Sequence, residues 1–508
     1  MSSITLGSWI TRRCRMTPHR TALVFEDRSW TYGELRERVD RLVHALRSLG
    51  VGFGDRVGYL GPNHPAFLEL LFAAGSLGAV PVPINYRLDR ETVRYIVEDA
   101  GCRVFVYAPE VTDTAAWLRE RTNVPSYVAL NTDEDVSSAY EYEQLLAAAS
   151  VEPFNVRVDL DDLGLMVYTS GTTGRPKGVM LTHGNLTWNA FNLLIAGSFR
   201  RDDVSLAIAP FFRVGGLAVT LLETLLVGGT VVLMPTFDPG EALRLIEHHK
   251  VTVLFGGPEL LQALKDHPTF RDTDFSAIRV CWTGGAPVPE HLITTYLERG
   301  TPILQGYGLS ETAPAALLLD PEDMTRKLGS AGRPVFFTDV RVVRPDLVDV
   351  EPGEVGEVLI AGPNVMKGYW DRPEATEAAL VEGRWLRTGD AARIDEEGYL
   401  YIVGRVADTY VTKGRLVHPG DVEHVLLQHP AVRETAVVGI PDQAAGEIGI
   451  AFVVPASMRE LTADDLLRWA SSRLDAPDIL HEIRFTDTIP RNPAGKVLRH
   501  ELRQNAVS

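Results

Sequence analysis

The chain has 508 residues, of which 45% are hydrophobic and 23% charged, with 44 Gly and 31 Pro. This composition is typical of globular proteins and excludes a disordered, collagenous or coiled-coil chain. At about 150 residues per domain, the length predicts about three folding units. The net charge of −17 argues against nucleic acid and anionic membranes as general partners, because both attract a positive surface.

No segment has the composition of a targeting or membrane-spanning sequence. The longest apolar run, Val214 to Pro235, contains Glu223 and two Gly pairs, and is therefore expected to form a helix, a turn and a strand. Cys14, Cys102 and Cys281 lie far apart, so neither a disulfide framework nor a cysteine zinc site is expected. We expect a cytoplasmic protein.

Residues 55–305 alternate short β-branched runs with amphipathic stretches of helix length. Strands are expected at Asp55–Leu60, Arg103–Tyr107, Leu163–Tyr168, Val204–Ala209, Thr230–Met234, Thr252–Phe255, Ile278–Thr283 and Pro302–Gln305. Helices are expected at Pro65–Leu77, Pro239–His249 and Pro289–Arg299. This alternation predicts an α/β fold with doubly wound parallel sheets covered by helices.

The pattern changes toward the C-terminus. Residues 329–403 alternate strands with glycine turns, which predicts a small antiparallel, β-barrel-like unit. Further strands are expected near 432–439 and 448–454, and helices at 421–428, at 462–474 and after Gly495. We therefore expect a large N-terminal domain, 1–404, and a smaller α+β C-terminal domain, 405–508, with a short connection near 404–408.

The strongest local signal is the segment Tyr168–Val179, which reads YTSGTTGRPKGV. Its glycines and hydroxyl residues leave backbone N–H groups and side-chain hydroxyls free to surround an anion, and Lys177 adds a compact positive charge suited to phosphate. Only seven of the 50 basic residues are lysine, which makes a lysine in this loop more informative than usual. The segment is not a Walker loop, because no Gly-Lys-Ser/Thr follows at the required spacing. A flexible hairpin turn is the alternative interpretation.

Three glycine-rich or polar segments each follow an expected strand. They are FFRVGG at 211–216, GGAP at 284–287 and GYGLSET at 306–312. If the strands are parallel, all three segments emerge at the carboxyl edge of one sheet, where open α/β folds bind ligands. Glu311 suits a Mg²⁺ that bridges phosphate oxygens, and Tyr307 offers a flat face to a base. Each segment alone could be an ordinary loop, but together they favour a nucleotide site.

Later segments add further polar groups. Asp390, in WLRTGD at 385–390, has two carboxylate oxygens that can accept from both hydroxyls of a ribose. Lys496 stands in PRNPAGKV at 490–497, a rigid loop before the final helix. A surface turn with a solvated lysine is the alternative interpretation of this loop.

In this order, the motifs resemble those of the adenylate-forming superfamily of acyl-CoA synthetases, luciferases and nonribosomal adenylation domains, and specifically its acyl-CoA synthetase branch. The matching segments are 168–179, 306–312, TGD at 388–390, GR…D at 404–408 and PR…GK at 490–496, and the similarity spans about residues 17–503. The resemblance implies a two-step reaction. ATP and a carboxylic acid first form an acyl-adenylate and pyrophosphate, and a thiol, usually CoA but also that of a carrier protein, then displaces AMP.

The resemblance also implies a nucleotide site. Its expected residues are Thr169, Ser170, Gly171, Thr172, Thr173, Gly174, Lys177, Gly285, Ala286, Gln305, Gly306, Tyr307, Gly308, Ser310, Asp390, Arg405 and Lys496. The loop 169–173 and Lys177 are expected to hold the β- and γ-phosphates. Asp390 and Arg405 are expected to hold the ribose, and Ser310 to touch the α-phosphate.

The remaining expected roles concern catalysis and the second step. The catalytic residues would be Lys496, Glu311, Thr172 and Arg213, with Glu311 also the Mg²⁺ ligand. The CoA-binding residues would be Lys413, Gly414 and Arg415. Asp408 would be the hinge about which a mobile C-terminal domain rotates between the half-reactions.

The chain departs from the family pattern at two positions. Arg213 stands where acyl-CoA synthetases usually carry a histidine near the substrate carboxylate. Its fixed positive charge would repel an ammonium, which argues against amino-acid activation. Arg213 is expected either to pair with an anionic group of the substrate, or to point away or pair with a protein carboxylate. Lys413 stands where many relatives have glycine, and it either narrows the pantetheine tunnel or meets the phosphates of CoA.

The sequence therefore predicts an ATP- and Mg²⁺-dependent acid–CoA ligase for a small to medium, aromatic or dianionic acid. Phe211, Phe212 and Trp282 are candidates for the pocket wall or for the core. Two alternatives stay open: an enzyme that only thioesterifies a preformed adenylate or uses an acceptor other than CoA, and a nucleotide-binding protein without turnover. The intact Lys177 and Lys496 argue against the last.

Overall fold

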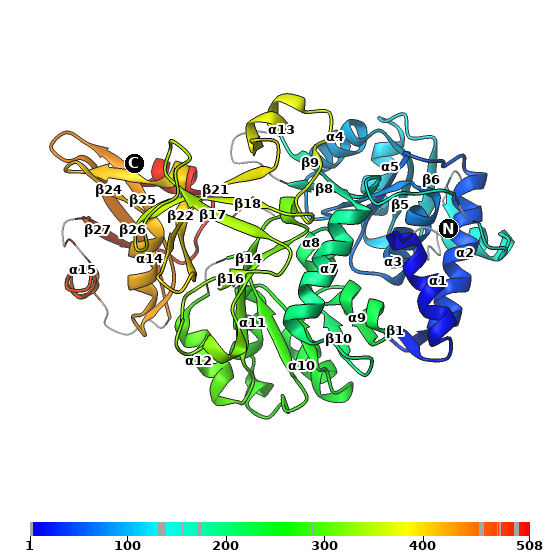
Figure 1. The fold of residues 1–508 in the computed structure, drawn as a ribbon, viewed down its shortest axis with the longest axis horizontal. Helices are drawn as coiled ribbons and strands as arrows, with labels where there is room; N and C mark the ends of the chain where they lie inside the picture. The colour runs from blue at the N-terminus through cyan, green and yellow to red at the C-terminus, as the bar shows by residue number, and fades with distance from the viewer. Residues whose placement is uncertain are drawn as a thin grey trace.

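A computed structural model describes residues 4–130, 139–154, 156–169, 175–286, 288–456, 462–474, 476, 479–491 and 497–507. Helices and strands alternate along most of this length (Figure 1). The α-helices are α1 (Leu6–Met16), α2 (Tyr32–Ser48), α3 (Pro65–Leu77), α4 (Arg90–Ala100), α5 (Thr112–Arg119), α6 (Tyr142–Ala148), α7 (His183–Gly197), α8 (Val214–Leu217), α9 (Leu221–Val227), α10 (Pro239–His248), α11 (Pro258–Asp266), α12 (Glu290–Glu298), α13 (Pro373–Ala379), α14 (Pro419–Leu427), α15 (Ala463–Ser471) and α16 (Arg499–Val507).

The largest sheet has nine strands. Their order is β16 (Arg333–Pro334), β15 (Ala315–Leu318), β14 (Ile303–Gly308), β13 (Val280–Thr283), β12 (Val253–Phe255), β10 (Val204–Ala207), β11 (Thr230–Leu233), β1 (Thr21–Phe25) and β2 (Arg28–Thr31). The six central strands, from β14 to β1, are parallel, so their carboxyl ends share one edge. The segment 306–308, expected as a loop, instead extends β14 and pairs with the antiparallel β15.

Two smaller sheets complete the N-terminal half. The first is all parallel, in the order β4 (Val80–Ile84), β3 (Arg56–Leu60), β5 (Cys102–Tyr107), β6 (Ser126–Ala129) and β7 (Tyr140–Glu141). The second is antiparallel, in the order β19 (Gly368–Tyr369), β9 (Lys177–Thr182) and β8 (Leu163–Thr169). β8 and β9 flank the segment 170–174.

The core lies between these sheets. α3 is apolar on all sides and almost every residue of it is buried, as expected for a helix enclosed by other elements. It packs against α1, α2, β4 and β8. Helices α10, α11 and α12 contribute buried side chains to a second cluster with β10, β12, β13 and β14. They therefore cover the face of the large sheet that points away from α3 (Figure 1).

Helix ends follow from local sequence. Thr31 begins α2 with a capping box in which its hydroxyl accepts from the backbone of Glu34, a contact that satisfies an otherwise unpaired N–H group. Thr182 and Asn185 begin α7 in the same way. α3 starts at a proline and ends before Gly78, which has a left-handed φ of 70°. These signals explain why the expected bounds of α3 and its observed bounds coincide.

Residues 339–405 form an antiparallel five-stranded sheet. Its strands are β17 (Asp339–Val343), β18 (Val355–Ala361), β21 (Trp385–Ile394), β20 (Leu380–Val381) and β22 (Leu400–Arg405). These five strands form the antiparallel sheet expected within 329–403. Two other strands of that range do not belong to it, because β16 pairs with the nine-stranded sheet and β19 pairs with β9.

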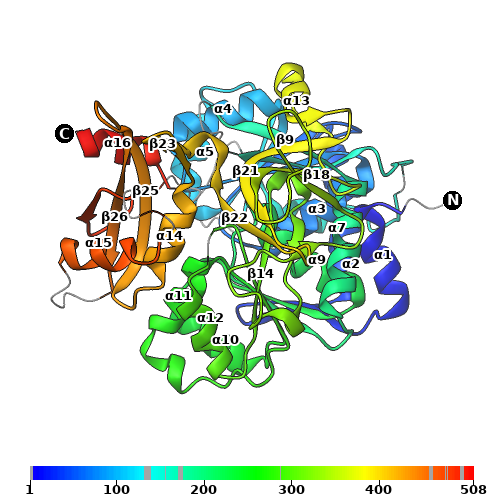
Figure 2. The same cartoon turned by 60° about the vertical axis from the view of Figure 1, so that its left-hand side comes forward.

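The last hundred residues form a separate α+β unit. Its sheet has the order β24 (Arg415–Val417), β23 (Tyr410–Thr412), β26 (Gly446–Pro455) and β25 (Val432–Asp442), with β27 (Glu482–Phe485) beside β26. α14 and α15 pack in one apolar cluster of the sheet and α16 in another. α14 also contacts β22 (Figure 2). The expected α/β class, with a large N-terminal part of several sheets and a smaller C-terminal part, is confirmed.

Within the described ranges, no helix is long and apolar enough to cross a membrane.

Candidate active site

The parallel strands bring the expected site segments to one edge. The carboxyl ends of β10, β13 and β14 border a cavity of about 340 Å³, whose opposite wall includes the end of β8. This volume lies in the range of small-molecule sites. The expected site residues in its lining are Thr169, Arg213, Gly285, Gly306, Tyr307, Gly308 and Ser310.

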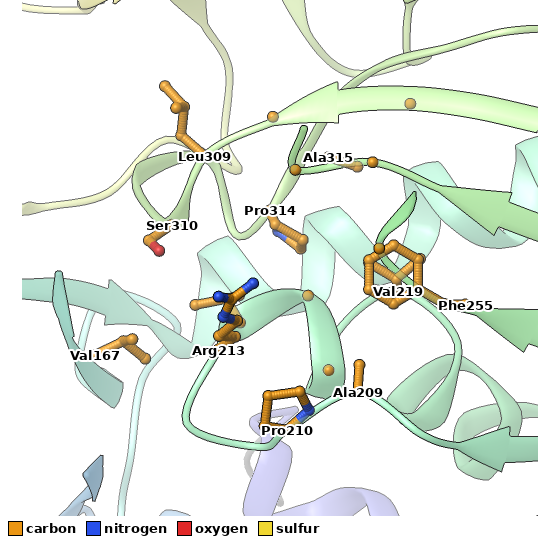
Figure 3. Close-up of a pocket in the computed structure, with 18 of the residues that line it drawn as sticks. Val167, Ala209, Pro210, Arg213, Val219, Phe255, Leu309, Ser310, Pro314 and Ala315 are labelled. Carbon is orange, nitrogen blue, oxygen red and sulfur yellow. The ribbon is translucent and has the colours of Figure 1, made fainter. Parts of the chain in front are cut away.

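One part of the cavity is apolar and includes aromatic rings. Its lining includes Phe212, Val219, Phe255, Leu260 and Trp282. In Figure 3, Phe255 and Val219 lie on the opposite side of the view from Ser310. Phe211 is not part of the wall, because its side chain is buried in the core with its ring centre 5.9 Å from that of Phe67.

Arg213 places a positive charge in this cavity. It precedes α8, and its side chain points toward the segment that carries Ser310 and Pro314 (Figure 3). Burial lowers the pKa of Arg213, whereas Glu259 opposes this shift and Arg87 adds to it. Among the described residues, no carboxylate lies within ion-pair distance of its guanidinium. An inward-facing cation without a protein partner is costly unless a ligand supplies the anion.

The ribose-binding residues implied by the resemblance meet beside Tyr307. Its hydroxyl donates to Oδ2 of Asp390 over 2.7 Å, and Nε of Arg405 lies 2.8 Å from Oδ1 of the same carboxylate. Asp390 and Arg405 are directly paired in the β21–β22 ladder, which explains why residues 15 positions apart face each other. Burial, together with Asp390, raises the pKa of Tyr307, so the phenol stays a donor and orients the carboxylate.

A second cluster surrounds Glu311. The hydroxyl of Tyr369 donates to its Oε1 over 2.9 Å, and Nζ of Lys177 lies 5.0 Å from the centre of the Tyr369 ring. The pairing of β19 with β9 creates this contact. Burial, followed by the charge of Glu311, raises the pKa of Tyr369. The cluster joins the expected metal ligand to the expected phosphate-binding lysine.

The donor set at Glu311 fits a magnesium ion shared with a nucleotide. Mg²⁺ usually takes one or two carboxylates, with water and phosphate oxygens filling its other positions. In the part of the chain that the structure describes, no group of three or more His, Cys, Asp or Glu side chains could hold a metal by itself. A single carboxylate beside the lysine expected to bind phosphate is compatible with the shared arrangement.

Other expected residues lie outside the cavity lining. Lys413, Gly414 and Arg415 form the exposed turn and first strand residue of the β23–β24 hairpin. Asp408 lies in the connection between β22 and β23, within ion-pair distance of Arg499 and Arg503. Oε1 of Gln305 is buried with no hydrogen-bond partner among the described residues, and Ala286 is exposed. Ser170, Gly171, Thr172, Thr173, Gly174 and Lys496 lie outside the described residues.

Sequence reasoning missed Tyr369 and Phe255. Tyr369 follows Glu311 by 58 residues, and no spacing rule connects them. Its only signal was the Gly-Tyr-Trp run at 368–370. Phe255 ends the expected strand at 252–255, but a strand pattern does not show which terminal side chain turns into a cavity.

Comparisons with known proteins identify the family of the chain. The family described as AMP-binding enzyme matches residues 10–370, and its C-terminal domain matches 421–496. The chain is 45% identical over 501 residues to feruloyl-CoA synthase from an Amycolatopsis species, and 37% identical over 500 residues to indoleacetate–CoA ligase from Aromatoleum aromaticum, with 98% of each chain covered in both cases. Among solved structures, anthranilate CoA ligase AuaEII in complex with anthranoyl-AMP superposes with a TM-score of 0.92 at 27% identity, covering 100% of this chain and 98% of that one.

The chain belongs to the AMP-binding enzyme family. Within this adenylate-forming superfamily it lies in the acyl-CoA synthetase branch. It is an AMP-forming acid–CoA ligase, which uses ATP to activate a carboxylic acid as an acyl-adenylate and then joins the acyl group to CoA.

Proposed function

We propose that the chain ligates an aromatic carboxylic acid to CoA, with the ring in the apolar part of the cavity and the carboxylate near Arg213 and Ser310. The observation that carries this proposal is an apolar wall containing Phe255 and Trp282 in the same cavity as Arg213, whose guanidinium has no carboxylate within ion-pair distance among the described residues. Flat rings pack well against such a wall. The names of feruloyl-CoA synthase, indoleacetate–CoA ligase and anthranilate CoA ligase all refer to aromatic acids, which supports the same substrate class.

The nucleotide would lie along the sheet edge. Asp390 can accept from the ribose hydroxyls while Tyr307 and Arg405 hold its carboxylate in place. Lys177 and the loop 169–174 would hold the β- and γ-phosphates. Glu311 would hold a Mg²⁺, whose charge neutralises the phosphates when it is bound. Catalysis is then positioning and charge stabilisation, without a covalent protein nucleophile.

The two half-reactions would use different parts of the C-terminal domain, 405–508. In the first, Lys496 meets the carboxylate and the α-phosphate as negative charge develops between them. In the second, rotation near Asp408 brings the hairpin with Lys413, Gly414 and Arg415 toward CoA. The exposed position of this hairpin supports such an exchange. A cytoplasmic location and the division at residue 404 remain predictions from the sequence.

The test compares AMP release from aromatic acids by the wild type and by Lys496→Ala. Loss of one charge-stabilising donor predicts a fall of about 10²–10³-fold in the adenylation rate, with thioesterification of a supplied acyl-adenylate retained. Lys265→Ala is a matched control, because this lysine lies at the end of α11 beside Asp266 and outside the cavity lining. A wild-type adenylation rate in Lys496→Ala would contradict the assigned role.

A second candidate rests on Arg213 alone. If its charge binds the carboxylate too tightly for attack on ATP, the chain performs only the thioesterification of a preformed adenylate. Absence of AMP with every acid, together with thioester formation from a synthetic adenylate and CoA, would favour this candidate.

A further inference from the structure

Ionic contacts anchor the connection between β22 and β23 at both ends. At its start, Nε of Arg405 lies 2.8 Å from Asp390, and Nη1 donates to the carbonyl oxygen of Thr388 over 3.0 Å. Both partners belong to β21, so Arg405 is fixed to the N-terminal part of the chain.

The other end of the connection is held by the last helix. Oδ2 of Asp408 lies 3.6 Å from Nη1 of Arg499, and Oδ1 lies 3.3 Å from Nη2 of Arg503. The two arginines are four residues apart in α16 and therefore share one face. The Asp408 side chain is only 20% exposed, so solvent screens these contacts less than it screens surface pairs.

Arg499 also joins α16 to the rest of the C-terminal sheet. Its Nη2 lies 2.6 Å from Oε1 of Glu423 on α14, and its Nε donates to the carbonyl oxygen of Val437 on β25 over 3.3 Å. The backbone N–H of Val437 donates to the same Glu423 oxygen over 2.8 Å. Arg499 thus connects four elements: the connection, α14, β25 and α16.

α16 begins at Arg499, directly after the segment that contains Lys496. The backbone N–H of Leu498 donates to Pro490 over 2.8 Å, and Arg491 forms an isolated bridge with Val497. Arg491 is further tied to Glu434 on β25 over 3.1 Å. The described residues on both sides of 492–496 are therefore fixed to the same body as Asp408.

We infer that Arg499 and Arg503 are positioning residues that fix the side chain of Asp408 to the C-terminal domain, so that the movable joint lies at Val406 and Ala407, just before the residue that the resemblance implies as the hinge. These two residues carry no charge and separate the two anchors, and Val406 is 42% exposed. Because Arg499 begins the helix that follows the described residues 497 and 498, rotation at the joint moves both described ends of the segment that contains Lys496 together with Asp408. The link to Lys496 rests on the proposed function, whereas the anchor itself does not.

The anchor is tested by trypsin cleavage of the native full-length protein, followed by mass spectrometry. The bond after Arg405 lies directly at the joint. We expect Arg503→Gln and Asp408→Asn each to speed cleavage at this bond about tenfold, and the double variant to add little, because the two groups act through one contact. Arg468→Gln is the matched control, since this arginine on α15 is 78% exposed and pairs with Asp465 away from the connection. Unchanged cleavage at this bond in both single variants would overturn the anchor.

The transmission to Lys496 is tested by separate half-reaction rates in the same variants. We expect Arg503→Gln to lower kcat for adenylation about tenfold with unchanged KM for ATP and acid, because neither α16 nor the connection lines the cavity. Arg503→Lys should restore part of the rate. Equal loss in Arg468→Gln, or a change confined to KM, would overturn the transmission. If the wild type has no adenylation activity, the proposed function is refuted. The cleavage experiment would still show whether Arg499 and Arg503 hold Asp408.

Discussion

At the residue scale, Arg213 is the position at which the sequence is expected to depart from the histidine of acyl-CoA synthetases. A histidine at this position can lose its charge near neutral pH, whereas a guanidinium cannot. The cavity therefore keeps a permanent cation beside Ser310. We therefore expect a substrate that carries an ammonium group to be disfavoured and a carboxylate to be held without a protonation step.

Replacement of Arg213 tests its contact with the substrate. Arg213→Gln should lower kcat/KM for an aromatic acid by between about 10- and 100-fold, because a charge-assisted hydrogen bond contributes about 1.5–3 kcal/mol. Steady-state AMP release measures the effect, and Arg213→Lys should retain part of the activity. A loss restricted to dicarboxylic acids would show instead that Arg213 binds a second anionic group.

Glu223 makes the stability of the folded state depend on pH. It lies fully buried in α9, its carboxyl oxygens have no hydrogen-bond partner among the described residues, and burial raises its pKa from 4.5 to about 8. The folded state therefore keeps a proton that the unfolded chain releases above pH 4.5. As pH rises from about 4.5 to 8, this group makes the folded state progressively less stable.

Glu223→Gln should remove that part of the pH dependence. Between pH 5 and 8, the free energy of unfolding of the wild type should fall relative to that of the variant by about 3–5 kcal/mol. Denaturant unfolding of both proteins at several pH values measures the difference between the two slopes. Parallel pH profiles would show that Glu223 ionises normally in the folded state.

At the element scale, the β23–β24 hairpin combines strain with exposure. Lys413 and Gly414 have φ angles of 48° and 77°, and Thr412 pairs with Arg415 across the turn. Two left-handed residues in a two-residue turn suit a hairpin but favour Gly or Asn over Lys. A lysine here costs about 1 kcal/mol relative to glycine, a cost that a functional contact of its ammonium would offset.

Lys413→Gly separates the two roles considered for this side chain. If the ammonium meets the phosphates of CoA, the variant should show a KM for CoA about 5–10-fold higher, with an unchanged adenylation rate and a slightly raised Tm. Thioester formation at varied CoA concentration measures this. A lower KM for CoA would indicate that Lys413 narrows the tunnel instead.

The elements themselves could largely be predicted from the sequence. α3 has proline at its start, glycine after its end and an unbroken apolar body, so local chemistry determines its bounds. The Tyr369–Glu311 contact could not be predicted, because it depends on the short strand β19 joining β9. The resemblance implied that Asp390 and Arg405 bind one ribose, but it did not predict their ion pair, since the β21–β22 register that creates the pair is a tertiary property.

At the scale of the whole molecule, the two parts are joined beyond the connection by the contact of α14 with β22 and by ion pairs between described side chains. Arg393 on β21 lies 3.4 Å from Asp421 on α14, and Glu290 on α12 lies 3.5 Å from His424. These side chains are substantially exposed, and such pairs contribute only about 0–1 kcal/mol each. Contacts of this strength can break and re-form during a reaction cycle, which is compatible with the proposed rotation of the C-terminal domain.

The most direct test of the account is the identity of the products. The protein is incubated with ATP, Mg²⁺ and a panel of aromatic and aliphatic acids of equal carbon number, with and without CoA, and the products are identified by mass spectrometry. The account predicts AMP and an acyl-CoA thioester with CoA present, formed preferentially from the aromatic acids. AMP or an acyl-adenylate without any thioester, or a preference for the aliphatic acids, would contradict it.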